Sequence, residues 1–195
     1  MRLLLSCSEL GLGHVSRVIP LGKKLEERGH ELFFFSGGTA YELLRNEFEN
    51  VYYCTPVAWY EASRGVITSA SLLNILLPLP RYNHELNRLE TKSASATETV
   101  HRYYDLRKHI LKIKPELVVS DGDMHALRLA YKWKIPSVWV TNILRPCYRF
   151  SPLLIPGERV TERYVKKCAK IIVPDNPRYT ICEYNLGDLD RMRIK

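Results

Sequence analysis

The chain has 195 residues, of which 46% are hydrophobic and 26% are charged. This balance is typical of one large folded domain and excludes a disordered chain. No apolar stretch approaches the ~20 residues that cross a bilayer, and the apolar run at the N-terminus is too short for the core of a signal peptide.

Charge and cysteine content narrow the classes of partner. The net charge of +8 favours anionic partners such as phosphates, nucleic acid or an acidic membrane surface. No zinc-finger spacing or aromatic RNA-binding motif accompanies it, so nucleic acid is not expected as a partner. The five cysteines are widely spaced and contain no CxxC pair, which indicates neither a disulfide framework nor a zinc site and favours the reducing cytoplasm.

The first predicted elements form one strand–helix–strand unit. The apolar run Arg2–Cys7 is typical of a strand covered on both faces. Apolar residues then recur at helical spacing from Val15, and Pro20 either kinks this helix or lies in its first turns. Gly29 ends the helix, and residues 31–36 (ELFFFS) form the second strand.

The same alternation continues along the chain. Further helices are expected at residues 37–44, 84–112, 124–133 and 158–168. Further strands are expected at residues 51–54, 117–120, 137–141 and 171–173. The sequence therefore predicts one α/β domain over residues 1–195, a doubly wound, mostly parallel sheet of about six to seven strands with helices on both faces.

In such sheets ligands bind beyond the carboxyl ends of the strands. The loop SELGLGH follows the first strand and contains Gly11, Leu12, Gly13 and His14. It matches neither the dinucleotide-binding fingerprint nor a P-loop, so it is either an anion-binding loop at a helix start or a plain turn. His14 favours a functional loop, because an imidazole there can act as a base.

The segment VVSDGDMHA follows a later strand. Asp121 is expected to point into the same crevice, where it could orient a hydroxyl or an imidazole. Asp123 is interpreted as a helix cap and His125 as a surface residue. A triad of Ser8, His14 and Asp121 is discounted because no GxSxG elbow is present.

Two other segments have less specific patterns. Residues 71–81 (SLLNILLPLPR) form either a core helix or an exposed apolar patch suited to a lipid surface. Because two prolines interrupt this stretch, we expect residues 72–79 to be partly exposed or poorly ordered. The basic run at residues 101–114 is interpreted as the solvated face of a helix.

Five segments together carry a resemblance to a known family. They are GLGHVSR, LEERGHELFFFSGG, VVSDGD, IPSVWVTN and KIIVPDNP. In this order they resemble the N-terminal domain of GT-B glycosyltransferases. The likeness is greatest to the family-28-like branch, which includes the lipid-linked peptidoglycan-precursor N-acetylglucosaminyltransferase and archaeal relatives.

The resemblance implies a Rossmann-like domain that binds the sugar or lipid-linked acceptor. His14 would deprotonate the acceptor hydroxyl, with Asp121 as the second candidate, and Arg17 would lie near the phosphates or on the helix surface. The other residues implied to face the substrate are Gly11, Leu12, Gly13, Gly37, Gly38 and Asn142. The family needs no bound metal, and the DGD at residues 121–123 is a look-alike of a metal-binding DxD.

The resemblance also implies a missing half. A second domain would hold the nucleotide sugar, such as UDP-N-acetylglucosamine, which is a donor substrate and not a cofactor. Residues 176–195 would lead toward that domain, and the chain would fold alone but need the partner domain or a second chain for transfer. The alternatives are half of a nucleotide-sugar epimerase, or a non-catalytic binding or membrane-recruiting module at the inner membrane face.

Overall fold

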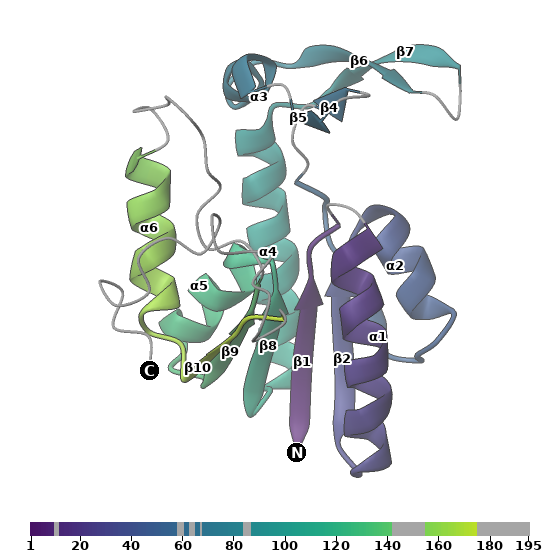
Figure 1. Cartoon of the computed structure of the whole chain (residues 1–195), viewed down its shortest axis with the longest axis vertical. Coiled ribbons are helices and arrows are strands. Elements are labelled where there is room, and N and C mark those ends of the chain that lie inside the picture. The colour runs from purple at the N-terminus through teal and green to yellow at the C-terminus, as the bar shows by residue number, and fades with distance from the viewer. Residues whose placement is uncertain are drawn as a thin grey trace.

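The centre of the molecule is a six-stranded sheet in which every pairing is parallel (Figure 1). A computed structural model of the chain describes residues 1–9, 12–57, 61–62, 65–66, 68–83, 87–141 and 155–174. The strands are β1 (Arg2–Cys7), β2 (Glu31–Ser36), β3 (Val51–Tyr53), β8 (Leu117–Asp121), β9 (Ser137–Val140) and β10 (Lys170–Ile172). Their order is β10-β9-β8-β1-β2-β3, which confirms the predicted α/β fold class.

Helices cover both faces of this sheet (Figure 1). The helices are α1 (Leu12–Glu27), α2 (Gly38–Arg45), α4 (Ser95–Ile113), α5 (Met124–Lys132) and α6 (Ile155–Val165). Because side chains alternate along a strand, Leu3 and Leu5 pack with α1 and α2, whereas Leu4 packs with α4 and α5. Pro20 lies inside α1, and α6 packs against α5 through Val165.

The strand order defines one switch point. From β1 the chain proceeds outward to β2 and β3, then returns to place β8 on the other side of β1 and continues outward to β9 and β10. The loops that follow β1 and β8 therefore diverge to opposite sides of the sheet. In open α/β sheets this divergence creates the crevice in which ligands bind.

The predicted helix over residues 84–112 is wrong in its first part. An antiparallel hairpin of β6 (Leu79–Asn83) and β7 (Arg88–Lys92) comes first, and α4 begins only at Ser95. Asn87 adopts a φ of 48°, a left-handed conformation that a helix cannot continue through. Pro80, which has no N–H to donate, suits a strand of a two-stranded hairpin. A shorter pair, β4 (Glu61–Ala62) and β5 (Gly65–Val66), and α3 (Thr68–Asn74) precede this hairpin.

The apolar segment at the end of α3 and directly after it is partly exposed, as predicted. Leu76 is 77% exposed, and Leu73, Ile75 and Leu77 are exposed with it, so the core-helix interpretation is wrong. Asn74, in contrast, is buried although it is polar, and its side chain donates to the carbonyls of Leu77 and Ser93 at 2.9 and 3.2 Å. Among the residues that the structure describes, no helix combines the length and apolarity that a membrane span requires.

Candidate active site

The crevice between β1 and β8 brings two of the predicted residues into contact. Cys7 and Asp121 pair across the two strands, and the backbone N–H of Ser8 donates to the carbonyl of Asp121 at 2.9 Å. Helix α1 starts at Leu12, so its first turn holds His14 beside the end of β8. The Nδ1 atom of His14 lies 2.7 Å from Oδ1 of Asp121.

Arg17 binds the same carboxylate. Its Nε and Nη2 atoms donate to Oδ2 and Oδ1 of Asp121 at 3.0 and 2.7 Å, a bidentate pair. Arg17 lies one turn after His14 on α1, and its Nη2 is 3.0 Å from Nδ1 of the imidazole. The resemblance implied that Arg17 lies near the phosphates or on the helix surface, whereas in the structure its guanidinium binds the carboxylate of Asp121.

The shorter of two contacts favours one tautomer of His14. Arginine only donates and an ionised carboxylate only accepts, so Nδ1 either accepts from Arg17 at 3.0 Å or donates to Asp121 at 2.7 Å, and the shorter contact favours a proton on Nδ1. Nε2 is then the acceptor of the ring. The His14 side chain is 19% exposed and that of Asp121 only 2%. The imidazole can therefore meet a ligand, while the carboxylate acts through it.

Gly122 supports the imidazole from behind. Its φ is +75°, and a Cβ at this position would lie 2.6 Å from Cε1 and 2.9 Å from Nδ1 of His14. The ring thus packs directly on the backbone of the loop after β8. No role was predicted for this glycine at the middle of DGD, although a glycine between two acidic residues after a strand is a signal for such a close approach.

The remaining predicted glycines have different surroundings. Gly37 is the N-cap of α2, and a Cβ there would lie 2.5 Å from the carbonyl of Cys54, so close packing requires this glycine. Gly38 adopts a φ of +52° beside the side chain of Glu9. Gly13 is in the first turn of α1, after the exposed Leu12. Two further predicted residues, Gly11 and Asn142, lie outside the described residues.

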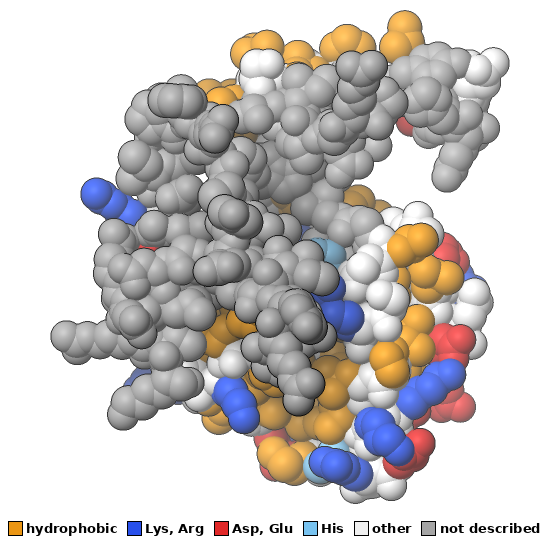
Figure 2. Space-filling view, in the orientation of Figure 1, with side chains coloured by type: hydrophobic (Ala, Val, Ile, Leu, Met, Phe, Trp, Pro, Cys, Tyr) orange, Lys and Arg blue, Asp and Glu red, His pale blue; other side chains and the backbone are white. Residues whose placement is uncertain are grey.

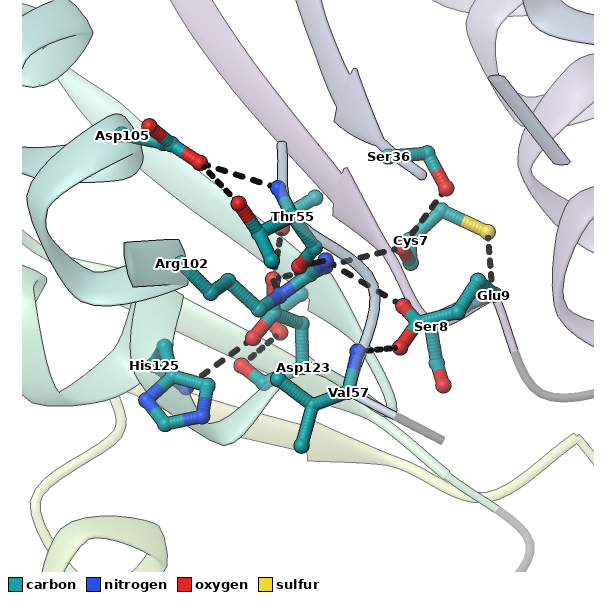
Figure 3. A network of polar contacts seen from close by, with 12 residues as sticks. Cys7, Ser8, Glu9, Ser36, Thr55, Val57, Arg102, Asp105, Asp123 and His125 are labelled. Carbon is teal, nitrogen blue, oxygen red and sulfur yellow. Dashed lines mark hydrogen bonds and ion pairs between the residues drawn. The ribbon is translucent and has the colours of Figure 1, made fainter. Parts of the chain in front are cut away.

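A second polar network lies beside this crevice, centred on Arg102 of α4 (Figure 3). Arg102 is 2% exposed, so the interpretation of residues 101–114 as a solvated face is wrong at this position. Its guanidinium contacts Oδ2 of Asp123 at 2.8 Å and Oε2 of Glu9 at 3.2 Å. One signal was available: Arg102 shares the helix face of the buried Leu106, Ile110 and Ile113.

Asp123 has two roles. It caps α5 as predicted, because its Oδ1 accepts from the backbone N–H of His125 at 3.0 Å. Its Oδ2 also accepts from Ser6 and from Arg102. Burial alone would raise the pKa of Asp123, but the positive charge of Arg102 outweighs burial and lowers it to about 2.

A pocket of about 150 Å³ opens between these groups. Its lining includes Ser8, Glu9, Val57, Gly122 and His125, together with the ion-paired Arg102 and Asp123. His125 is half-buried, which corrects its interpretation as a surface residue; burial lowers its pKa, and the charge of Arg102 lowers it further. Within the described part of the chain, no three histidine, cysteine or acidic side chains gather as a metal site would require.

Comparison with known proteins gives sequence relatives of one kind. No family model matches the chain. An uncharacterized glycosyltransferase of Methanosarcina acetivorans is 30% identical over 201 residues, which cover 97% of this chain and 47% of the relative. Another, from Methanosarcina mazei, is 26% identical over 190 residues, covering 93% of this chain and 45% of the relative.

Solved structures agree in fold. MurG from Acinetobacter baumannii superposes with a TM-score of 0.55 at 10% identity, over 91% of this chain and 42% of that one. The spinosyn rhamnosyltransferase SpnG gives 0.57 at 11% identity, over 91% and 46%. The UDP-GlcNAc 2-epimerase from Methanocaldococcus jannaschii gives 0.54 at 16% identity, over 100% and 43%.

Coverage explains what the chain represents. It spans about half the length of the curated relatives and of the solved structures that it matches. The glycosyltransferases among these structures have the GT-B fold, which is built from two such halves, and this confirms the resemblance drawn from the sequence. The chain is thus related in sequence to archaeal glycosyltransferases and has the fold of one half of a GT-B glycosyltransferase.

Proposed function

We propose that the chain is the acceptor-binding half of a nucleotide-sugar-dependent glycosyltransferase, in which His14 is the general base. The observation that carries this proposal is the contact of His14 with Asp121 and Arg17 at the switch point of the sheet. The sequence relatives, which are glycosyltransferases, support the reaction class. UDP-N-acetylglucosamine is the donor that the resemblance suggests.

In this proposal each side chain has a separate task. Nε2 of His14 accepts the proton of the acceptor hydroxyl while that oxygen attacks the anomeric carbon of the donor. The bond from this carbon to the diphosphate breaks, and the nucleoside diphosphate leaves with its electron pair. Asp121 keeps the imidazole oriented and stabilises the imidazolium that forms, as the aspartate of a catalytic triad does. Asp121 is therefore a positioning residue, because its carboxylate is already engaged by Arg17 and His14.

The donor belongs to a second domain in this proposal. The relatives and the solved GT-B enzymes are about twice as long as this chain, which leaves room for a nucleotide-sugar domain on the same polypeptide or on a partner. Transfer requires both substrates to be held in one geometry across the crevice. No metal or organic cofactor is proposed for the reaction.

Two alternatives have observations in their favour. The likeness to a UDP-GlcNAc 2-epimerase, at the same TM-score level as MurG, fits half of a nucleotide-sugar epimerase. The exposed apolar residues after α3 fit a peripheral contact with a membrane, which would suit a lipid-linked acceptor or a module that only recruits a catalytic partner. Dependence of sugar transfer on His14 separates the proposed enzyme from a purely recruiting module.

The proposal can be tested by supplying the chain with a donor domain. The part of the Methanosarcina acetivorans relative that this chain does not match would be fused to the chain or co-expressed with it. Sugar transfer from UDP-N-acetylglucosamine would then be measured. His14→Ala should lower turnover by about 10²-fold or more, because general base catalysis contributes that much. Asp121→Asn should also lower turnover, since it breaks the contacts that orient the ring.

The matched control is His101→Ala, which removes an exposed histidine from α4. Its turnover should equal that of the parent protein. Unchanged turnover in His14→Ala would rule out the proposed base. Epimerisation of the nucleotide sugar without transfer would favour the epimerase alternative instead.

A further inference from the structure

The pocket beside the imidazole has a defined relation to the proposed base. Gly122 lines the pocket on one side, and the ring of His14 occupies the space that a Cβ on this glycine would need. Ser8, which also lines the pocket, packs against the same glycine. A group bound in this pocket would therefore lie next to His14, at the carboxyl ends of β1 and β8.

Arg102, the cation that lines the pocket, has no N–H group left to donate to a ligand. A guanidinium has five N–H groups. Those of Arg102 point to Asp123 from Nε and Nη2, to the carbonyls of Thr55 and Cys7, and to Glu9. These five contacts account for all five N–H groups. A phosphate or carboxylate would have to displace one of them from a fully buried ion pair.

The acceptors of the pocket are not exhausted. Glu9 accepts from the backbone N–H of Val57, from Arg102 and from its own backbone N–H, which are three contacts against the roughly four lone-pair positions of a carboxylate. Its side chain is 8% exposed. His125 stands in the same lining, and because burial lowers its pKa it is neutral at physiological pH, with one ring nitrogen that donates and one that accepts. A group that both donates and accepts hydrogen bonds complements this lining, whereas two carboxylates against one guanidinium repel an anion.

We propose that this pocket, the Glu9 pocket, binds an uncharged hydroxyl-bearing part of the sugar acceptor and excludes phosphate and carboxylate groups. The proposal rests on the proposed function, since it names the acceptor chemistry of that same crevice. The volume of 150 Å³ equals the share of about five water molecules in the liquid, enough for one edge of a sugar ring with its hydroxyls. The net charge of +8 favours anionic partners for the protein as a whole, but in this proposal the part of the substrate that enters the pocket is uncharged.

The test measures binding by the chain alone, without a donor domain. Ligand-observed saturation-transfer NMR would compare two probes that share a sugar and differ in charge, methyl α-glucoside and glucose 1-phosphate. Methyl α-glucoside should bind with a millimolar Kd, as expected for a small polar ligand. Glucose 1-phosphate should bind no more tightly, despite the basic protein.

Two variants probe the pocket by different routes. Glu9→Gln removes the free carboxylate lone pairs and should weaken methyl α-glucoside binding by about fivefold or more. Val57→Phe fills the pocket and leaves the Arg102 ion pairs intact, so it should abolish binding without loss of folding. The matched control is Glu47→Gln, whose carboxylate pairs with Lys23 on the surface, and binding should be unchanged.

Three results would each overturn the proposal. They are no binding of methyl α-glucoside up to its solubility, unchanged binding in the folded Val57→Phe variant, or tighter binding of glucose 1-phosphate that is lost in that variant. None of these depends on catalysis. Failure of the proposed function would appear separately, as turnover that does not depend on His14.

Discussion

His14 and Arg17 lie one turn apart on α1, and both reach the single carboxylate of Asp121. Arg17 carries a permanent positive charge, and its Nη2 lies 3.0 Å from Nδ1 of His14. The bidentate pair with Asp121 neutralises this charge, so one carboxylate serves both side chains. Loss of Asp121 would leave the guanidinium against the imidazole with no negative charge between them.

The support that Gly122 gives to this ring leads to a prediction. In Gly122→Ala the new Cβ would collide with Cε1 of His14, because the two atoms would lie 2.6 Å apart. The backbone strain at a φ of +75° adds to this, and together they should cost about 1–3 kcal/mol of stability. Turnover of the completed enzyme should fall further than stability alone explains, since the ring must move.

Gly29→Ala is the matched control for this change. Gly29 has the same φ of +75°, but nothing lies within 4 Å of a Cβ at that position. Thermal unfolding and turnover would be measured for both variants. Equal losses in both would mean that only the backbone matters and that the contact with His14 does not.

For single residues, the sequence predicted that His14 and Asp121 lie at the same crevice. It did not predict the buried ion pairs of Arg102 with Asp123 and Glu9. His14 and Asp121 each follow a strand that could be recognised from its apolar run, and parallel strands end at one edge of a sheet. Arg102 lies in a basic run that was interpreted as a solvated face, and no role was predicted for Glu9. Whether a charge is buried depends on its partners, and these come from segments distant in the chain.

Among the elements, the strands of the central sheet were predictable because a strand buried on both faces appears in the sequence as a continuous apolar run. All six strands of the central sheet were expected within one residue at each end, and the helix α5 was expected almost to its last residue. The hairpin β6–β7 was missed, because its alternation is weak and RLETK also suits a helix. A two-stranded hairpin with exposed faces lacks the apolar run that identifies a core strand.

The element that carries the exposed leucines leads to a second prediction. Figure 2 shows hydrophobic side chains at the top of the molecule, over α3 and the β6–β7 hairpin, where Leu73, Leu76 and Leu89 are exposed. The chain should float with vesicles of anionic phospholipid at low salt. Leu73→Ser combined with Leu76→Ser should reduce the floating fraction severalfold, because less apolar area enters the interface.

Leu111→Ser provides the control, since Leu111 is also exposed but lies near the end of α4 away from this surface. Its floating fraction should be unchanged. Absence of flotation at low salt would exclude the membrane contact. An equal reduction in all variants would show that the lipid contact is not confined to this segment.

Across the whole molecule, the buried ion pairs couple folding to pH. The pKa of Asp123 is about 2 in the folded protein, below its ordinary value of 3.8. Its ionised form is therefore favoured by folding, and the resulting stability is present above about pH 4 and is lost as the pH falls toward 2. The contribution is on the order of 2 kcal/mol. Burial raises the pKa of Glu9, which acts in the opposite direction.

Asp123→Asn tests this coupling. Urea unfolding followed by circular dichroism between pH 7 and pH 2 should show a less stable protein at neutral pH, because Arg102 loses its nearest partner. The variant should also lose less stability than the parent protein between pH 4 and pH 2. The exposed pair of Lys24 with Glu27 supplies the control Glu27→Gln, which should follow the parent curve. Identical pH slopes in Asp123→Asn and the parent protein would contradict the role of Asp123.

The order of the strands has a consequence for how this protein is made. Strand β1 is synthesised before the other strands of this sheet and pairs with β2 through an early local crossover, but its other neighbour, β8, begins only at Leu117. Until the ribosome has passed that point, the apolar β1 presents an unpaired edge, which is a template for aggregation. The contact of His14 with Asp121, 107 residues apart, can form only when that edge is closed. The proposed catalytic pair is therefore also a marker that the central sheet has been completed.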